Sequence, residues 1–89
     1  MREFRWNAWN VGHIAEHDIT PDEVEYVVRS ARPPYPRHGR NDTWLVWGQA
    51  ETGRHLQVAY FIDENDEIYV IHARPLEHHE KRSLRRRKR

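Results

Sequence analysis

Two arginines, Arg54 and Arg74, are the residues whose type and spacing best suit phosphate chemistry. Arg54 opens one strand-like run and Arg74 closes the next, so antiparallel pairing of the runs would bring both guanidinium groups to the same end of a sheet. A guanidinium donates hydrogen bonds in pairs and stays charged, which suits the pentavalent phosphorus formed during RNA cleavage. The competing interpretation is that each arginine forms a surface ion pair with Glu51, Asp63 or Glu77. Spacing alone leaves both interpretations open.

Histidines are the second group that could do chemistry, because the chain has seven of them in 89 residues. His13 and His17 are four residues apart and would share a helix face, where two imidazoles can bind one cation. However, no carboxylate stands at a recognised third-ligand spacing, and the adjacent His78 and His79 would point in different directions. The pattern therefore favours ordinary surface or helix-packing histidines over a metal site, and we expect no metal or other cofactor.

The end of the chain is strongly basic. Seven of its fifteen basic residues lie in residues 81–89, and all fourteen acidic residues precede that segment. Residues 1–80 then hold eight basic residues against fourteen acidic ones, a formal charge of −6 next to a segment of +7. A cationic segment of this kind most often meets a phosphate backbone or an acidic protein. RNA is the partner class that we expect first.

Length and composition indicate one small domain. A chain of 89 residues can enclose a single core, and we place the domain at 1–80 with a basic tail at 81–89 that continues the last helix. The sequence has no cysteine, no apolar run near 20 residues and no apolar stretch after Met1. We therefore expect a cytoplasmic protein with neither a disulfide nor a membrane span.

Two helices are predicted in the first third of the chain. Asn7 is a candidate N-cap for a short helix that reaches about His17. Thr20, Pro21 and Glu23 form a stronger start signal, with a cap, a proline at the first helical position and a glutamate that can close a capping box. The apolar stripe of this second helix has helical spacing and consists of Val24, Val27, Val28 and Ala31, before Pro33-Pro34 ends it.

Three strand-like runs follow a proline-containing loop at 33–42. They cover about 43–50, 54–62 and 67–74, and turn-forming residues separate them. Phe4–Trp6 could add a short strand, and Pro75 could open a final helix that runs into the tail. The predicted fold class is α+β, with two N-terminal helices and a C-terminal helix packed on a small antiparallel sheet of three to four strands.

Four aromatic residues could offer platforms on which unpaired bases stack, although aromatic residues more often belong to the core. They are Tyr35, Trp44, Trp47 and Tyr60. Trp44 and Trp47 lie on opposite faces of their predicted strand, so we expect at most one of them to face solvent.

Several short motifs occur in an informative order along nearly the whole chain. They are Phe4-Arg5-Trp6-Asn7, the segment 13–19, the acidic helix at 20–28, the hairpin 48–54 that ends in Arg54, Ala73-Arg74, and Glu80-Lys81-Arg82. This order resembles the BrnT-type family, ribonuclease toxins of bacterial type II toxin-antitoxin pairs. The chain departs from the family pattern at Asn7, Glu16, Asp18 and Leu84.

The resemblance implies a RelE-like fold and a metal-independent attack of a ribose 2′-OH on the adjacent phosphate. It also implies inhibition by an antitoxin with a ribbon-helix-helix DNA-binding domain. On this interpretation RNA lies across the exposed face of the sheet, Arg54 and Arg74 stabilise the phosphorane, and His17 acts as general base or acid, since an imidazole titrates near neutral pH. The residues expected to hold the RNA backbone are Arg40, Lys81, Arg82 and Arg85.

The main alternative is a noncatalytic module. In that case the acidic body binds a basic partner, and the cationic C-terminal arm attaches loosely to nucleic acid. Backbone binding of this kind would weaken steeply as the salt concentration rises.

Overall fold

A computed structural model of the chain describes residues 2–87. Both predicted N-terminal helices are present. Helix α1 (Ala8–Ala15) begins after Asn7, whose side chain accepts a hydrogen bond from the Asn10 backbone while the Asn10 side chain accepts one from Asn7. The helix ends two residues before His17, the predicted boundary, because Asp18 adopts a left-handed backbone conformation (φ 59°).

Helix α2 (Pro21–Arg29) begins as predicted. Thr20 caps it, Pro21 is its first residue, and the Glu23 carboxylate accepts a hydrogen bond from the Thr20 backbone N–H to close the capping box. Val24, Val27 and Val28 of the predicted stripe are buried, the first two fully, whereas Ala31 follows the end of the helix and is half-buried. A methyl group built on Gly48 of the sheet would lie 3.2 Å from a Val27 methyl carbon, so helix and sheet are in close contact there.

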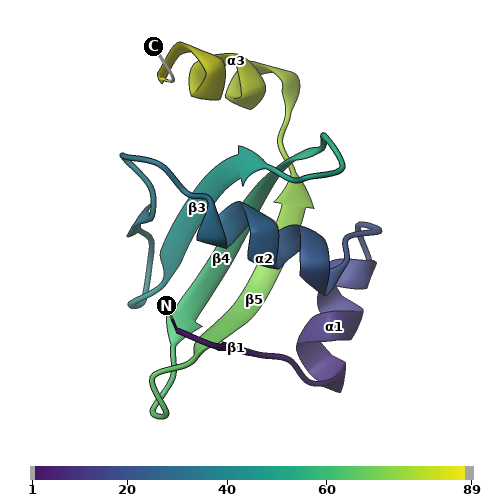
Figure 1. Cartoon of the computed structure of the whole chain (residues 1–89), viewed down its shortest axis with the longest axis vertical. Helices are drawn as coiled ribbons and strands as arrows, with labels where there is room; N and C mark the ends of the chain where they lie inside the picture. Colours follow the sequence, from purple (N-terminus) through teal and green to yellow (C-terminus); the bar gives the residue numbers. More distant parts are fainter. Residues whose placement is uncertain (1, 88–89) are drawn as a thin grey trace.

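The sheet has five strands in the order β1-β5-β4-β3-β2 (Figure 1). The predicted meander is confirmed and consists of β3 (Trp44–Gln49), β4 (His55–Ile62) and β5 (Ile68–Pro75), paired antiparallel. Two strands of two residues each extend it: β1 (Phe4–Arg5) and β2 (Arg37–His38).

The prediction of a purely antiparallel sheet of three to four strands is wrong. β1 pairs parallel to β5, so the sheet is mixed, and β2 adds an edge strand inside the predicted loop at 33–42. The possible strand predicted at Phe4–Trp6 is thus present as β1, whereas β2 is too short to leave a period-two pattern in the sequence. The fold class α+β is confirmed.

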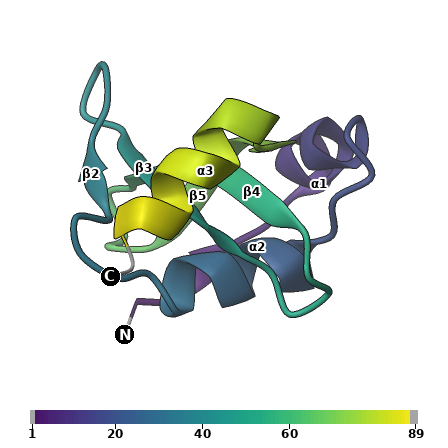
Figure 2. The ribbon, with the colours of Figure 1, turned by 90° about the horizontal axis from the view of Figure 1, so that it is seen from above.

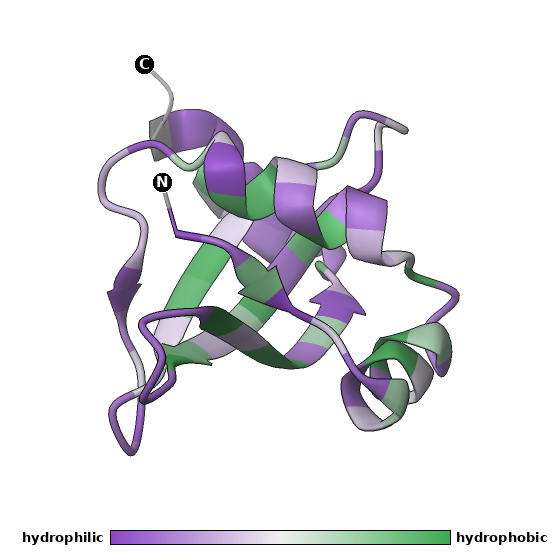
Figure 3. Ribbon diagram, turned by 60° about the horizontal axis from the view of Figure 1, so that its bottom comes forward, coloured by the Kyte–Doolittle hydropathy of each residue, from purple (hydrophilic) through white to green (hydrophobic). Residues whose placement is uncertain are grey.

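The core lies between α1, α2 and one face of the sheet. Leu56, Val58 and Tyr60 of β4 point into it, as their alternation predicts, and they meet Ile14 of α1 and the valines of α2. Figure 1 shows α2 in front of the sheet and α1 beside β5. In Figure 3 the strands carry most of the hydrophobic colour, whereas the connection between β2 and β3 is hydrophilic.

The opposite face of the sheet, which we call the far face, carries residues that alternate with the core residues. Strand pairing places Gln57 opposite Arg74, Ala59 opposite His72 and Phe61 opposite Tyr69. Paired residues project to the same side of a sheet, so these six side chains share the far face.

Helix α3 (His78–Arg87) lies over the end of the sheet where β5 finishes (Figures 1 and 2). The predicted start at Pro75 is wrong, because Pro75 still belongs to β5 and the following Leu76 donates a backbone hydrogen bond to His55. Leu84 is buried and joins α3 to the core. Residues 81–87 do continue the last helix, as expected, and residues 88–89 of the predicted tail lie outside the described residues.

Candidate nucleic-acid interface

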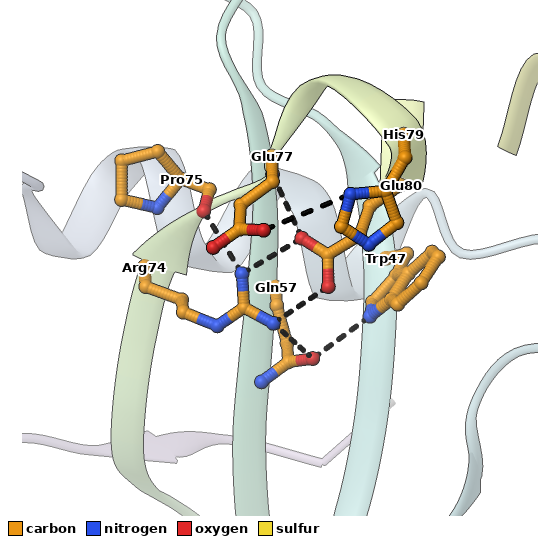
Figure 4. A network of polar contacts seen from close by, with 7 residues as sticks. All are labelled: Trp47, Gln57, Arg74, Pro75, Glu77, His79 and Glu80. Carbon is orange, nitrogen blue, oxygen red and sulfur yellow. Dashed lines mark hydrogen bonds and ion pairs between the residues drawn. The ribbon is translucent and has the colours of Figure 1, made fainter. Parts of the chain in front are cut away.

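Arg74 binds a carboxylate rather than standing free (Figure 4). Its two terminal nitrogens donate to the two carboxylate oxygens of Glu80, at 2.8 Å each. The same guanidinium also donates to the Pro75 carbonyl at 3.1 Å and to the Gln57 side chain at 3.3 Å. Gln57 accepts a further bond from the Trp47 indole, so this network joins β3, β4 and β5 to α3.

The charge state of the Arg74–Glu80 pair follows from this geometry. The hydrogen bond from Arg74 lowers the pKa of Glu80 from 4.5 to about 2. The same bond raises the pKa of Arg74 above its ordinary value. The prediction of an unpaired Arg74 guanidinium is therefore wrong: Glu80, rather than Glu77, is the partner, because it stands on the inner side of α3 directly above the end of β5.

Arg54 is also engaged. Its terminal nitrogens donate to the backbone carbonyls of Asp18 and His17, at 2.8 and 3.1 Å, and its Nε lies 4.0 Å from a Glu23 oxygen. The last carbonyls of a helix lack partners within the helix and favour a cation. Arg54 thus closes the end of the α1 segment, and the expectation that it converges with Arg74 as a second free guanidinium is wrong.

His17 belongs to a cluster of three imidazoles. The His17 ring lies edge-on to His72 of β5 with a centroid distance of 6.0 Å, and the His13 ring lies 5.8 Å from His72. The helical spacing of His13 and His17 predicted that they share a face. That face turns toward His72. No local pattern singled out His72, because its neighbours in the strand, Ile71 and Ala73, are apolar.

His72 is the most enclosed member of the cluster. Partial burial is the main cause that lowers its pKa below the ordinary histidine value, and the nearby His13, His17 and Arg74 act in the same direction.

The four cations predicted to hold RNA do not form one site. Arg40 lies in the turn between β2 and β3, next to the start of β3, whereas α3 lies beyond the opposite end of the meander. The six residues of β3 separate these ends by about 17 Å. Lys81, Arg82 and Arg85 do share α3, and Arg82 and Arg85 are exposed. Within residues 2–87, no carboxylate pairs with any of the four.

The predicted base-stacking aromatics face inward. Tyr35 and Tyr60 are buried, and Trp47 stacks on Tyr35 while its indole donates to Gln57. Trp44 is half-buried, with the His38 ring 4.0 Å away.

The exposed aromatic surface lies elsewhere, at Trp9 of α1, which is 55% exposed and touches His13 and Tyr69. The sequence signal for this contact is that Trp9 stands four residues before His13, because residues at that spacing share a helix face.

Two further findings concern the residues that the structure describes. Within 2–87, no group of three or more histidine, cysteine or acidic side chains is arranged to hold a metal ion. No helix in this part of the chain is long and apolar enough to cross a membrane.

The comparisons with known proteins add no relative. No family model, no curated protein and no solved structure matches the chain.

Proposed function

We propose that this protein is a metal-independent ribonuclease that uses His72 and His17 as its acid-base pair. The observation that supports the proposal best is the imidazole cluster, since it places two titratable rings 6.0 Å apart at the border of the far face. The two rings meet edge-on, so one phosphodiester seated beside the pair, rather than between the rings, would be within hydrogen-bond reach of both. Both rings can therefore contact one phosphodiester.

The two rings suit opposite halves of the reaction. His72, whose surroundings favour the neutral form, takes the proton from a ribose 2′-OH. The 2′-oxygen then attacks phosphorus and forms a new P–O bond while the bond from phosphorus to the 5′-oxygen breaks. Protonated His17 gives its proton to that 5′-oxygen. The products are a 2′,3′-cyclic phosphate and a 5′-hydroxyl end.

Arg54 and Arg74 support this site as positioning residues. Arg54 holds the backbone carbonyl of His17, and Arg74 stands two residues along β5 from His72 on the same face. Helix α3 supplies the cations that would bind neighbouring phosphates. Arg82, Arg85 and Arg86 are exposed and have helical spacing, so they project from the outer side of α3, while Glu80 and Leu84 project inward.

The experiment is cleavage of an end-labelled single-stranded RNA in the presence of EDTA, followed by analysis of the product ends. Wild type should release 2′,3′-cyclic phosphate. His72→Asn and His17→Asn should each lower the rate by about 100-fold or more, the usual contribution of one acid-base group. His78→Asn is the matched control, because His78 is exposed on α3 and is not part of the cluster.

Each result decides between explanations. Undiminished cleavage in the His17→Asn, His72→Asn double variant would remove the site assignment. Loss of wild-type activity on adding EDTA would contradict the metal-independent mechanism.

The biological role in the proposal is that of a type II toxin that inhibits translation, with a ribbon-helix-helix antitoxin as its partner and a RelE-like arrangement of its elements. The support for this part is the order of motifs that resembles the BrnT-type toxins. Expression in bacteria should arrest growth, and His72→Asn should relieve the arrest at equal protein level.

A noncatalytic RNA-binding module is the second candidate. One observation favours it: both arginines expected to stabilise a phosphorane are engaged inside the protein, Arg74 by Glu80 and Arg54 by backbone carbonyls. Salt-sensitive RNA binding without any cleavage product would decide for this candidate.

A further inference from the structure

A continuous aromatic surface borders the imidazole cluster. Phe61 contacts Tyr69 at a centroid distance of 5.4 Å, Tyr69 stacks near Trp9 at 6.4 Å, and Trp9 stacks on His13 at 5.0 Å with an interplanar angle of 10°. These rings come from β4, β5 and α1 in turn. The surface thus joins the far face of the sheet to the first helix.

Contacts from several elements hold this surface in place. The Tyr69 hydroxyl donates to the side chain of Asn7, the residue that caps α1, at 3.2 Å. The Arg5 guanidinium carbon lies 4.1 Å from the Tyr69 ring centroid, and Arg5 is itself held by Asp63 at 2.7 Å. Trp9 therefore rests on ordered neighbours, so a ligand that stacks on it would find a preformed platform.

We propose that Trp9, supported by Tyr69 and His13, is a binding site for one unpaired nucleobase of a single-stranded nucleic acid. The inference deepens the proposed function, on which it rests, by naming a base subsite next to the imidazoles. Two ring-to-ring steps, of 5.0 Å from Trp9 to His13 and 5.8 Å from His13 to His72, separate the platform from the cluster.

The surroundings of the platform favour a nucleic acid over a peptide. Trp9 keeps more than half of its surface exposed; the His13 ring, which is 3.9 Å from the Glu16 carboxylate, stands beside it, and the Arg5 guanidinium lies over the neighbouring Tyr69 ring. Exposed cations of α3, Arg82 and Arg85 among them, lie past the opposite end of β5 from Tyr69, where they would meet phosphates farther along the same strand. An aromatic ring beside cations is the combination that binds a base together with its phosphates.

The test measures binding of a labelled 2′-O-methyl oligonucleotide, in which the blocked 2′-oxygen prevents cleavage. We expect Trp9→Ala to weaken binding by about 5- to 150-fold, the range of stacking on one base, and Trp9→Phe to restore part of it. Tyr26→Ala is the matched control, since Tyr26 is a 44% exposed aromatic on α2, away from the far face. An abasic oligonucleotide of the same length, which keeps the phosphates, should bind wild type and Trp9→Ala equally.

Binding and cleavage fail independently in this design. Equal binding of the oligonucleotide by wild type and Trp9→Ala, with both variants folded by circular dichroism, would overturn the base subsite even if RNA cleavage is observed. A loss that is equally large with the abasic oligonucleotide would also overturn it, because stacking would not be the cause. Base-dependent loss in a protein that does not cleave RNA would uphold the subsite and contradict only the proposed reaction.

Discussion

Glu80→Gln is the substitution that tests the contact between α3 and the sheet most directly. The change keeps the shape of the side chain and removes its charge, so Arg74 loses a bidentate carboxylate. The Glu80 side chain is only 12% exposed and that of Arg74 29%, and a guanidinium enclosed to this extent is destabilising without a counter-charge.

The size of the effect follows from the pKa of Glu80. A fall from 4.5 to about 2 corresponds, at about 1.4 kcal/mol per pKa unit, to an upper limit of about 3 kcal/mol. Solvent reaches the pair from the Arg74 side and screens it, so we expect a loss of about 1–2 kcal/mol in the free energy of unfolding at pH 7. For a domain of this size the melting temperature should fall by about 5–15 °C.

The pH dependence gives a second readout with a definite sign. The folded-state pKa of Glu80 lies below its unfolded value, so the stabilisation is complete above pH 4.5 and is lost as the pH falls toward 2. The difference between wild type and Glu80→Gln should therefore shrink over that interval.

Urea denaturation at a series of pH values measures the loss in the free energy of unfolding and its pH dependence. Glu77→Gln is the control, because the Glu77 side chain is largely exposed and its ion pair is with His79, at 3.7 Å, instead of Arg74. Equal losses in the two variants, or a difference that persists at pH 2, would refute this account of the contact.

Three further predictions concern stability and binding. Burial lowers the pKa of His72, so on acidification this residue takes up a proton in the unfolded chain before it does so in the fold. The fold should therefore lose stability as the pH falls below about 6.5, and thermal melts of His72→Asn between pH 7 and 5 should lack this pH-dependent loss. Arg54→Ala should cost about 0.5–1.5 kcal/mol in chemical denaturation by removing its hydrogen bonds to the exposed carbonyls of His17 and Asp18, whereas an unchanged free energy of unfolding would contradict the contact. Replacing Arg82 and Arg85 by glutamine should reduce the slope of log binding constant against log salt by about 0.7 per lost phosphate contact on single-stranded RNA, and an unchanged slope would exclude α3 from the interface.

The sequence predicted the parts of the fold that follow local rules. Thr20, Pro21 and Glu23 form a helix start signal through contacts within four residues, so distant parts of the chain are not needed to predict it. The alternation of apolar residues in β4 identifies its buried face, because one face must pack on the core. The parallel pairing of β1 with β5 joins residues more than sixty positions apart over only two residues. So short an element has no periodicity of its own, and the sheet order could not be predicted.

The candidate site also has parts that the sequence predicts and parts that depend on tertiary packing. Antiparallel pairing correctly put Arg54 and Arg74 toward one end of the sheet, but composition does not say which carboxylate or carbonyl reaches a guanidinium first. Glu80 reaches Arg74 because β5 continues to Pro75 and α3 starts only at His78. The prediction placed the start of this helix too early, since proline is common at the first helical position. His72 joins His13 and His17 only through the packing of α1 beside β5, which no local pattern of the sequence encodes.

The inward orientation of Glu80 also determines the charge that the outer surface of α3 presents to a polyanion. Glu80 is the only acidic residue in α3, and its charge is neutralised against the sheet instead of along the helix. A negatively charged strand would therefore meet guanidinium groups on the outside of α3 with no intervening carboxylate from that helix. Moving the same acid by one or two positions would leave the net charge of the chain unchanged and yet place a repulsive group in the path of the strand.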